Sequence, residues 1–377
     1  MDFSFTEDQQ AVGRLAREIL EKEVTTERLR AAERDPDWFD RPLWDTLAEA
    51  GLVGLAAGES AGGMGLGVLE ACSLLIEIGR AVAPVPALPA MVASLALSRW
   101  GTGEQQERWL APLASGQAIL AVALDDAGSA DPRRPGVRAR TSDGGWVLSG
   151  CKRHVRAAHL ADRLLVSAAC DGGTAVFLVD PAAEGARLTR QTISTGEPLT
   201  TIELDGVRVG EADLLGGPSG VDAERAGWMA DHALVCACAL QVGVSERALE
   251  ITAAHLRERI QFGVPIGSLQ AVQQRAADCY IGLEAMRWCM WRAAWRLSVD
   301  LPASAEAQIA KFWAADAGSN LANAAQHLHG GLGVDVDYPI HRYFLWSKSL
   351  ELELGSATEQ VARLGKFLAH AGIEERA

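Results

Sequence analysis

The sequence lacks the features that mark several specialised classes of protein. No apolar run reaches about 18 residues without a charged residue, the length that a membrane-spanning helix needs, so we expect no membrane partner. No signal-peptide pattern precedes the first helical segment, which favours a cytoplasmic location. The seven cysteines are odd in number and include no CxxC pair, so the sequence favours free buried thiols over a metal site.

The sequence also has fewer basic than acidic residues. The chain carries 35 Lys and Arg against 49 Asp and Glu, a formal net charge of −14. Nucleic acids and anionic membranes attract clustered positive charge, so this balance opposes both as partners. With 377 residues, of which 49% are hydrophobic and 22% charged, the chain reads as globular and long enough for two or three domains.

The hydrophobic pattern divides the chain into three expected domains. Residues 1–117 show apolar residues at helical spacing, beginning after a capping box at 6–9. Residues 118–216 change to short β-branched runs punctuated by Gly, Asp and Pro, and residues 222–377 return to helical spacing. The sequence therefore predicts a mainly α fold with a central β domain.

The secondary structure expected in the second and third parts is more specific. Four runs read as strands and lie at 146–148, 163–168, 175–179 and 201–204. Their short spacing without intervening helices predicts an antiparallel sheet or barrel. Four long helices are expected at 222–261, 268–299, 304–328 and 340–370. Helices of this length are typical of a four-helix bundle.

Six short motifs occur along the chain in a fixed order, at 101–116, 143–153, 204–216, 257–263, 265–273 and 329–339. The most specific are Arg257-Glu258-Arg259-Ile260-Gln261-Phe262-Gly263 and His329-Gly330-Gly331-Leu332-Gly333. Taken singly, the first could be a helix end with a glycine cap and the second a turn. Taken together and in order, they resemble the acyl-CoA dehydrogenase family over nearly the whole chain.

This resemblance implies an N-terminal α-helical domain, a middle antiparallel β-barrel and a C-terminal four-helix bundle. It also implies an oxidoreductase of lipid metabolism that binds FAD and acts on an acyl-CoA thioester. Electron-transfer flavoprotein is the expected electron acceptor. Members of the family form tetramers in which neighbouring chains share each flavin site.

The resemblance also implies which residues contact FAD. Arg259, Gln261 and Phe262 match the segment that reaches a neighbour's FAD, and Gly330-Gly331 match the last landmark. A guanidinium can hold pyrophosphate in a bidentate manner, and glycine lets the backbone approach a cofactor closely. His327 occupies the position where the family usually has Gln, and Gln326 stands just before it. An imidazole can still form a hydrogen bond there, so we keep both residues as expected contacts.

The chain departs from the family at the catalytic base. Counting from Tyr338-Pro339 places Leu354 where the family has its Glu, and leucine cannot accept a proton. Because Leu350, Leu352 and Leu354 alternate with Glu351 and Glu353, we expect both acids to face solvent, away from the pocket.

Some family members carry the base on the first long C-terminal helix instead. In this chain that region is Asp231-His232-Ala233-Leu234, which contains no Glu. Asp231 is the alternative base, and His232 could also titrate.

A second departure concerns the flavin ring. The family's Trp-Ile-Thr triplet is replaced by His154-Val155-Arg156, and Asp125 and Asp126 occupy the loop that usually supplies hydroxyl donors. Acidic charge beside a flavin that becomes more negative on reduction is unfavourable. The segments that reach a neighbour are kept, whereas those that would hold the chain's own ring are lost.

Three functions follow from these observations. The leading hypothesis is a non-catalytic subunit that shares FAD with a base-bearing partner in an α2β2 heterotetramer. The run at 329–346 resembles the actinobacterial branch that forms such tetramers for degradation of steroid side chains. The second is a self-sufficient flavoenzyme with altered chemistry that uses Asp231. The third is a DNA-binding relative, which the charge of −14 opposes.

Overall fold

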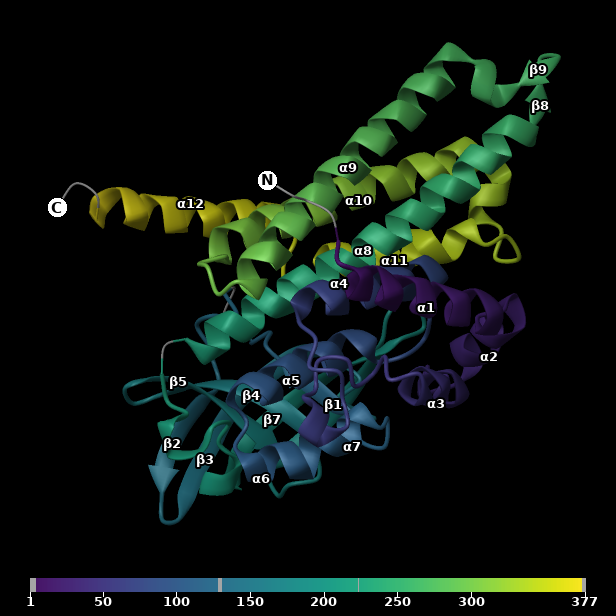
Figure 1. Cartoon of the computed structure of the whole chain (residues 1–377). Coiled ribbons are helices and arrows are strands. Elements are labelled where there is room, and N and C mark those ends of the chain that lie inside the picture. The colour runs from purple at the N-terminus through teal and green to yellow at the C-terminus, as the bar shows by residue number, and fades with distance from the viewer. Residues whose placement is uncertain (1–4, 128–130, 223, 375–377) are drawn as a thin grey trace.

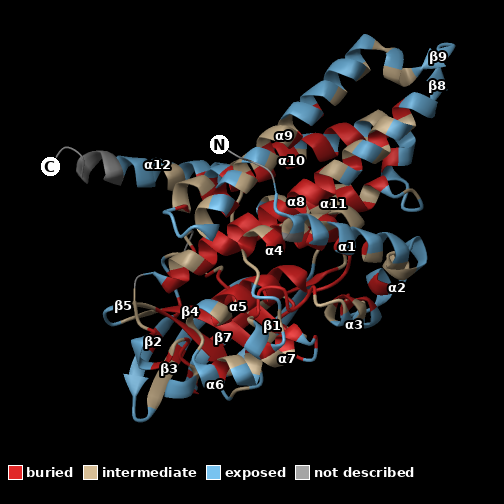
Figure 2. Ribbon diagram, viewed as in Figure 1, coloured by how far each residue is buried: buried red, intermediate tan, exposed pale blue. Residues whose placement is uncertain are grey.

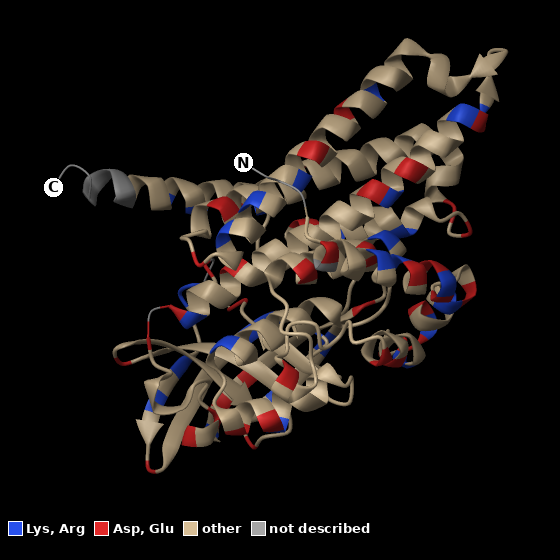
Figure 3. Cartoon of the chain, viewed as in Figure 1, with Lys and Arg blue, Asp and Glu red and all other residues tan. Residues whose placement is uncertain are grey.

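The computed structural model describes residues 5–127, 131–222 and 224–374. Long helices occupy one side of the molecule and a curled sheet the other, with the N-terminal helices packed between and beside them (Figure 1). Figure 3 shows basic and acidic residues interspersed over both parts. Within the described residues, no helix is both long and apolar enough to cross a membrane.

The first part of the chain is helical, as predicted. Its helices are α1 (Glu7–Glu23), α2 (Thr26–Arg34), α3 (Arg41–Glu49), α4 (Val68–Ala81), α5 (Ala87–Trp100), α6 (Gly103–Gln105) and α7 (Ala111–Ala114). The predicted capping box before α1 is confirmed, because Thr6 accepts a hydrogen bond from the backbone of Gln9 and Gln9 caps Thr6 in return. Asp40 likewise caps α3 through its side chain, and Pro42 lies in the first turn of that helix.

The middle part is a seven-stranded sheet. Its strands are β1 (Leu120–Ala123), β2 (Arg138–Ser142), β3 (Gly145–Arg156), β4 (Arg163–Cys170), β5 (Gly173–Val179), β6 (Ala186–Thr192) and β7 (Pro198–Gly210). The four predicted runs lie in β3, β4, β5 and β7, whereas β1, β2 and β6 were not predicted. The pairing is also not purely antiparallel, because β4 pairs in parallel with β1 and β2. The connections after β1 and β2 are long enough to return the chain in the same direction.

The last part contains five helices in the described residues: α8 (Arg225–Glu258), α9 (Gln270–Ser298), α10 (Ser304–His329), α11 (Ile340–Leu352) and α12 (Ala357–Glu374). The first three agree with the prediction. The fourth expected helix, 340–370, is wrong as a single element. Leu354 and Gly355 adopt left-handed backbone angles, with φ of 54° and 106°, so α11 ends before them and α12 begins in a new direction. Figure 1 shows α12 projecting from the body.

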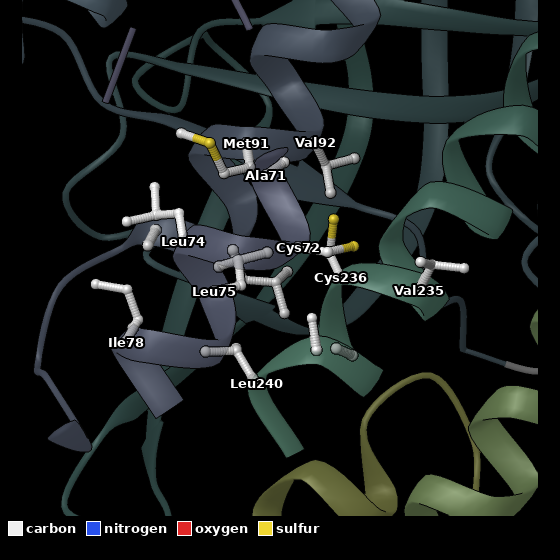
Figure 4. Packing of buried hydrophobic residues seen from close by; sticks show 14 of the residues in the cluster. Ala71, Cys72, Leu74, Leu75, Ile78, Met91, Val92, Val235, Cys236 and Leu240 are labelled. Atoms are coloured by element: carbon white, nitrogen blue, oxygen red, sulfur yellow. The ribbon is translucent and has the colours of Figure 1, made fainter. Parts of the chain in front are cut away.

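The core joins the first and last parts. Figure 2 shows buried residues concentrated on α4, α5, α8 and the inner strands. Helices α4 and α8 cross at close range, because a Cβ built on Gly79 would lie 2.2 Å from the carbonyl oxygen of Leu240. Cys72 on α4 and Cys236 on α8 pack into this contact as free, buried thiols (Figure 4). Glycine at the crossing therefore brings the two helix backbones together.

Candidate functional site

A cavity of about 430 Å³ lies where α5, the sheet and the end of α11 meet. Most of its walls are apolar side chains, namely Leu88, Pro89, Val92, Val122, Leu124, Val155, Ile193, Leu199, Ala233, Leu352 and Leu354. Its polar residues are Asp125, Arg153, His154, Arg156, Ser194, Lys348, Ser349 and Glu353. Leu354, His154 and Arg156, which the sequence singled out separately, line this one cavity. Its size is within the usual range for a small-molecule pocket.

Arg156 is the centre of a buried ionic cluster in the cavity wall. Its Nε donates to Glu353 Oε2 at 2.9 Å, and its Nη2 donates to the Ser349 hydroxyl at 2.9 Å. Its Nη1 donates to Glu197, just before the start of β7. Burial alone would lower the pKa of Arg156, but its attraction to Glu197 and Glu353 raises that pKa above the ordinary value. The arginine is therefore a fixed cation held between two carboxylates.

The structure corrects the prediction that Glu353 faces solvent. Its carboxylate lies in the cavity wall, and only 11% of its side chain is exposed. The expected alternation fails because α11 is helical up to Leu352 and the chain then turns through the left-handed Leu354. Glu351 is the more exposed of the two acids, and it pairs with Lys348. Glu353 therefore lies next to Leu354, but its carboxylate forms an ion pair with Arg156.

Asp125 and Asp126, in the loop that follows β1, have different surroundings. His154 Nδ1 lies 2.6 Å from Asp125, and this hydrogen bond raises the pKa of His154. Asp126 is turned into the sheet, where it accepts a hydrogen bond from the buried Lys152 at 2.7 Å. It also accepts one from the backbone of Val137. The expectation that both acids would face a flavin is therefore wrong for Asp126, which neutralises a buried lysine.

Asp231 does not line the cavity in the part of the chain that the structure describes. It is buried, forms an ion pair with Arg133 and accepts a hydrogen bond from the Ser304 hydroxyl at 2.6 Å. Burial raises the pKa of Asp231, and the charge of Arg133 opposes that shift. Arg133 and Ser304 therefore engage both of its oxygens, and these contacts oppose the predicted alternative in which this residue acts as the base.

His232 is also unsuited to proton transfer near neutral pH. Its Nδ1–H donates to the backbone oxygen of Trp228 at 2.9 Å, and its ring stacks on the Trp228 indole with centroids 3.4 Å apart. Burial lowers the pKa of His232 to about 3. The imidazole is therefore a neutral packing group in α8.

A second region lies at the far end of the long helices. The short hairpin of β8 (Ile260–Gln261) and β9 (Val264–Pro265) joins α8 to α9 and projects from the molecule (Figure 1). Arg259, Gln261 and Phe262 are all exposed on it. The Phe262 ring is 90% exposed, although its backbone adopts the left-handed region at φ 54°. An exposed apolar ring on a projecting hairpin is typical of an interaction site.

The corner after α10 carries the remaining expected contacts. Arg275 Nη1 donates to His327 Nδ1 at 2.8 Å, which ties α9 to α10, and Gln326 lies beside it, half-buried. Gly330 has φ 58° and needs glycine for its own backbone. Gly331 lies in the short helical turn η6 (Gly330–Val334), and a Cβ built on it would meet nothing within 4 Å. The fold does not require glycine at Gly331, so the open space there suits the approach of a group from outside.

The two regions differ in how well their residues suit FAD. The cavity wall presents an arginine with two carboxylates in place of an aromatic platform and hydroxyl donors, which does not fit a flavin ring. The exposed hairpin and the Gly330-Gly331 corner offer a guanidinium, an outward aromatic ring and unhindered backbone, which fit the pyrophosphate and flat faces of FAD. Sequence reasoning missed Glu197 and Ser349, because neither has a local motif and each meets Arg156 only through the fold.

The helical first part, the curled sheet and the C-terminal helices around one cavity define the fold of the acyl-CoA dehydrogenases. Residues 6–117 match the model of the acyl-CoA dehydrogenase N-terminal domain, and residues 224–369 match that of the C-terminal domain. The chain belongs to the acyl-CoA dehydrogenase family.

Two curated relatives come from Mycobacterium tuberculosis. Acyl-CoA dehydrogenase FadE27 is 40% identical, and the match covers 98% of this chain and 99% of the relative. Acyl-CoA dehydrogenase FadE28 is 34% identical, with 97% and 98% covered.

Two solved structures have the same fold over nearly their full length. One chain of a variant of the Tcur3481-Tcur3483 steroid acyl-CoA dehydrogenase has a TM-score of 0.91 and 43% identity, covering 97% of this chain and 99% of that chain. A chain of the ChsE4-ChsE5 complex from M. tuberculosis has a TM-score of 0.91 and 40% identity, covering 98% and 99%.

Proposed function

We propose that this chain is the non-catalytic subunit of a heteromeric, FAD-dependent acyl-CoA dehydrogenase. In this proposal it completes the FAD site of a base-bearing partner in an α2β2 tetramer, and it is inactive alone. The observation that carries the proposal is the cavity wall. Leu354 stands where the family has its base, and the Arg156 cluster takes the place of the groups that would hold a flavin ring.

The electrostatics of the cavity support this division of roles. Glu353 is the acid nearest to Leu354 in sequence, but its carboxylate accepts a hydrogen bond from Arg156. A carboxylate that is hydrogen-bonded to a buried guanidinium cannot turn toward a substrate without breaking that ion pair. Removing the arginine would leave two carboxylates, Glu197 and Glu353, without a cation. In this chain Arg156 neutralises both carboxylates.

The exposed half-site supports the other part of the proposal. We define the half-site as Arg259, Gln261, Phe262, Gln326, His327, Gly330 and Gly331. Arg259, Gln261 and Phe262 are exposed on the projecting hairpin, so they are available to a neighbouring chain. When bound, FAD takes the β hydrogen of the acyl thioester as hydride. Arg259 would bind the anionic pyrophosphate, and Gly331 would admit the cofactor close to the backbone.

The names of the relatives support a substrate class. Two of the structures most like this chain are named as paired chains, and one pair is named a steroid acyl-CoA dehydrogenase. We propose an acyl-CoA thioester of a steroid side chain as the substrate of the complex. Electron-transfer flavoprotein is the proposed acceptor of the electrons that FAD collects.

Flavin stoichiometry of the purified complex tests the proposal. The chain is expressed alone and together with a candidate base-bearing acyl-CoA dehydrogenase chain, and FAD is released and quantified against protein. We expect two FAD per four chains in the complex and none in the lone chain. Four FAD per four chains, or a yellow lone chain with dehydrogenase activity, would contradict the proposal.

A further inference from the structure

Three aromatic side chains form a cluster directly behind the half-site. The His255 and His329 rings stack with centroids 4.5 Å apart and an interplanar angle of 26°. The Tyr338 ring also contacts His329, with centroids 5.2 Å apart and an interplanar angle of 53°. His255 belongs to α8, His329 ends α10, and Tyr338 precedes α11. The cluster therefore joins three elements where they approach the half-site.

The half-site has two arms, the hairpin segment that carries Arg259 and the corner that carries Gly330 and Gly331. The cluster is close in sequence to both arms. Arg259 follows His255 by one helical turn, and its backbone N–H donates to the His255 carbonyl at 2.9 Å. Gly330 and Gly331 follow His329 directly. A shift between the two rings would therefore move Arg259 relative to the glycine corner. No other ring pair among the described residues joins α8 to the end of α10.

His329 is held as a neutral ring. Its Nδ1–H donates to the Ala325 carbonyl at 2.8 Å, and its exposed fraction is 5%. Its Nε2 is buried and has no hydrogen-bond partner among the described residues. A proton on Nε2 would place a buried positive charge without an acceptor, which is costly. The stack consequently depends on both rings being uncharged.

We infer that His255, His329 and Tyr338 are positioning residues that set the spacing between the two arms of the cofactor half-site, and that acid loosens this spacing. The inference rests on the proposed function, because it concerns how the half-site is held. It assigns a role to residues that need not touch FAD.

The charges around the stack determine the direction of the pH effect. Burial, then His329, then Arg259 lower the pKa of His255, while Glu258 opposes them. Burial lowers the pKa of His329. Burial and the charge of the same Glu258 raise the pKa of Tyr338. Because the pKa values of both imidazoles are lowered from 6.5, the stack is intact above about pH 6.5 and is lost as the pH falls through the lowered values.

The test measures FAD affinity of the reconstituted heteromeric complex at several pH values, with FAD fluorescence as the readout. For the wild type we expect affinity to be constant above about pH 6.5 and to fall as the pH is lowered through the lowered pKa values of the two imidazoles. His255→Phe keeps an aromatic ring that cannot protonate, so its acid fall should be clearly smaller. His159→Phe removes a histidine with a lowered pKa elsewhere in the fold, and this control should keep the wild-type profile.

Opposite results would overturn the inference. Tighter FAD binding in acid would mean that extra positive charge simply attracts pyrophosphate, and an unchanged acid fall in His255→Phe would show that the stack is not the titrating element. His329→Asn keeps a donor for the Ala325 carbonyl but removes the ring, so we expect about tenfold weaker binding at neutral pH. Wild-type affinity in that variant would also overturn the inference.

Arg259→Ala separates failure of the inference from failure of the proposed function. If Arg259→Ala weakens FAD binding but His255→Phe has the wild-type pH profile, the half-site stands and the cluster has no positioning role. If Arg259→Ala leaves FAD binding unchanged, the half-site itself is wrong and the inference falls with it.

Discussion

Arg156 Nε and Glu353 Oε2 lie 2.9 Å apart and join strand β3 to the residue that follows α11. The two residues are 197 positions apart in the chain, and both side chains are only 11% exposed. This contact lies in the wall of the cavity beside Leu354. The ion pair thus fastens the sheet to the C-terminal helices at the place where the family carries out its chemistry.

The first prediction concerns Arg156→Met. Methionine fills similar space but leaves Glu197 and Glu353 buried without their cation, so we expect the free energy of unfolding to fall by about 3–5 kcal/mol. Chemical denaturation followed by far-ultraviolet circular dichroism measures this change. Arg187→Met is the matched control, because the ion pair of Arg187 with Glu203 is exposed and should contribute less than about 1 kcal/mol. Equal effects in the two variants would show that the buried cluster is not a stabilising contact.

The second prediction concerns Leu354→Glu, which restores the family's residue at the expected position. We expect the lone variant chain to show no dehydrogenase activity, because a base without a flavin cannot complete the reaction and the ring-binding groups stay replaced. Acyl-CoA-dependent dye reduction measures this. The control is the complex in which the partner's catalytic carboxylate is neutralised. That complex should lose activity, and adding Leu354→Glu to it should not restore any. Activity in the lone variant would mean that only the base was missing.

Much of the fold could be predicted from local patterns. The capping box at Thr6 depends on contacts three residues apart, and the long helices α8, α9 and α10 repeat their apolar faces over many turns. The pairing of β4 in parallel with β1 could not be predicted, because strand partners are set by the path of the loops and not by composition.

The candidate site was only partly predictable. The motifs located Leu354, His154 and Arg156, but not the fact that Glu353 turns into the cavity. That turn follows from a left-handed leucine, and leucine carries no sequence signal for φ of 54°. The acidic partners of Arg156 lie 41 and 197 residues away, so only the folded chain brings them together.

The third prediction concerns Gly331→Val. Nothing lies within 4 Å of a Cβ at this position, so we expect the melting temperature of the lone chain to be nearly unchanged. In the heteromeric complex the added side chain would obstruct FAD, and we expect FAD binding to weaken about tenfold or more. Gly13→Val is the matched control, since its Cβ also has open space but lies on α1, away from the half-site. Unchanged FAD binding in Gly331→Val would contradict close approach of the cofactor.

The fourth prediction concerns the acid stability of the His232 site. The pKa of His232 is lowered by burial to about 3, against 6.5 for an exposed histidine, so the unfolded chain binds more protons between these values. Its contribution to stability is therefore complete above about pH 6.5 and is lost as the pH falls toward 3.

His232→Phe keeps a ring that can stack on Trp228 but cannot protonate. We expect the wild type to lose about 1 kcal/mol per pH unit relative to this variant below pH 6.5. Urea denaturation at several pH values measures the difference, and its value above about pH 7.5 reports the packing change alone. Parallel stability curves for the two proteins would contradict a neutral, buried imidazole at this position.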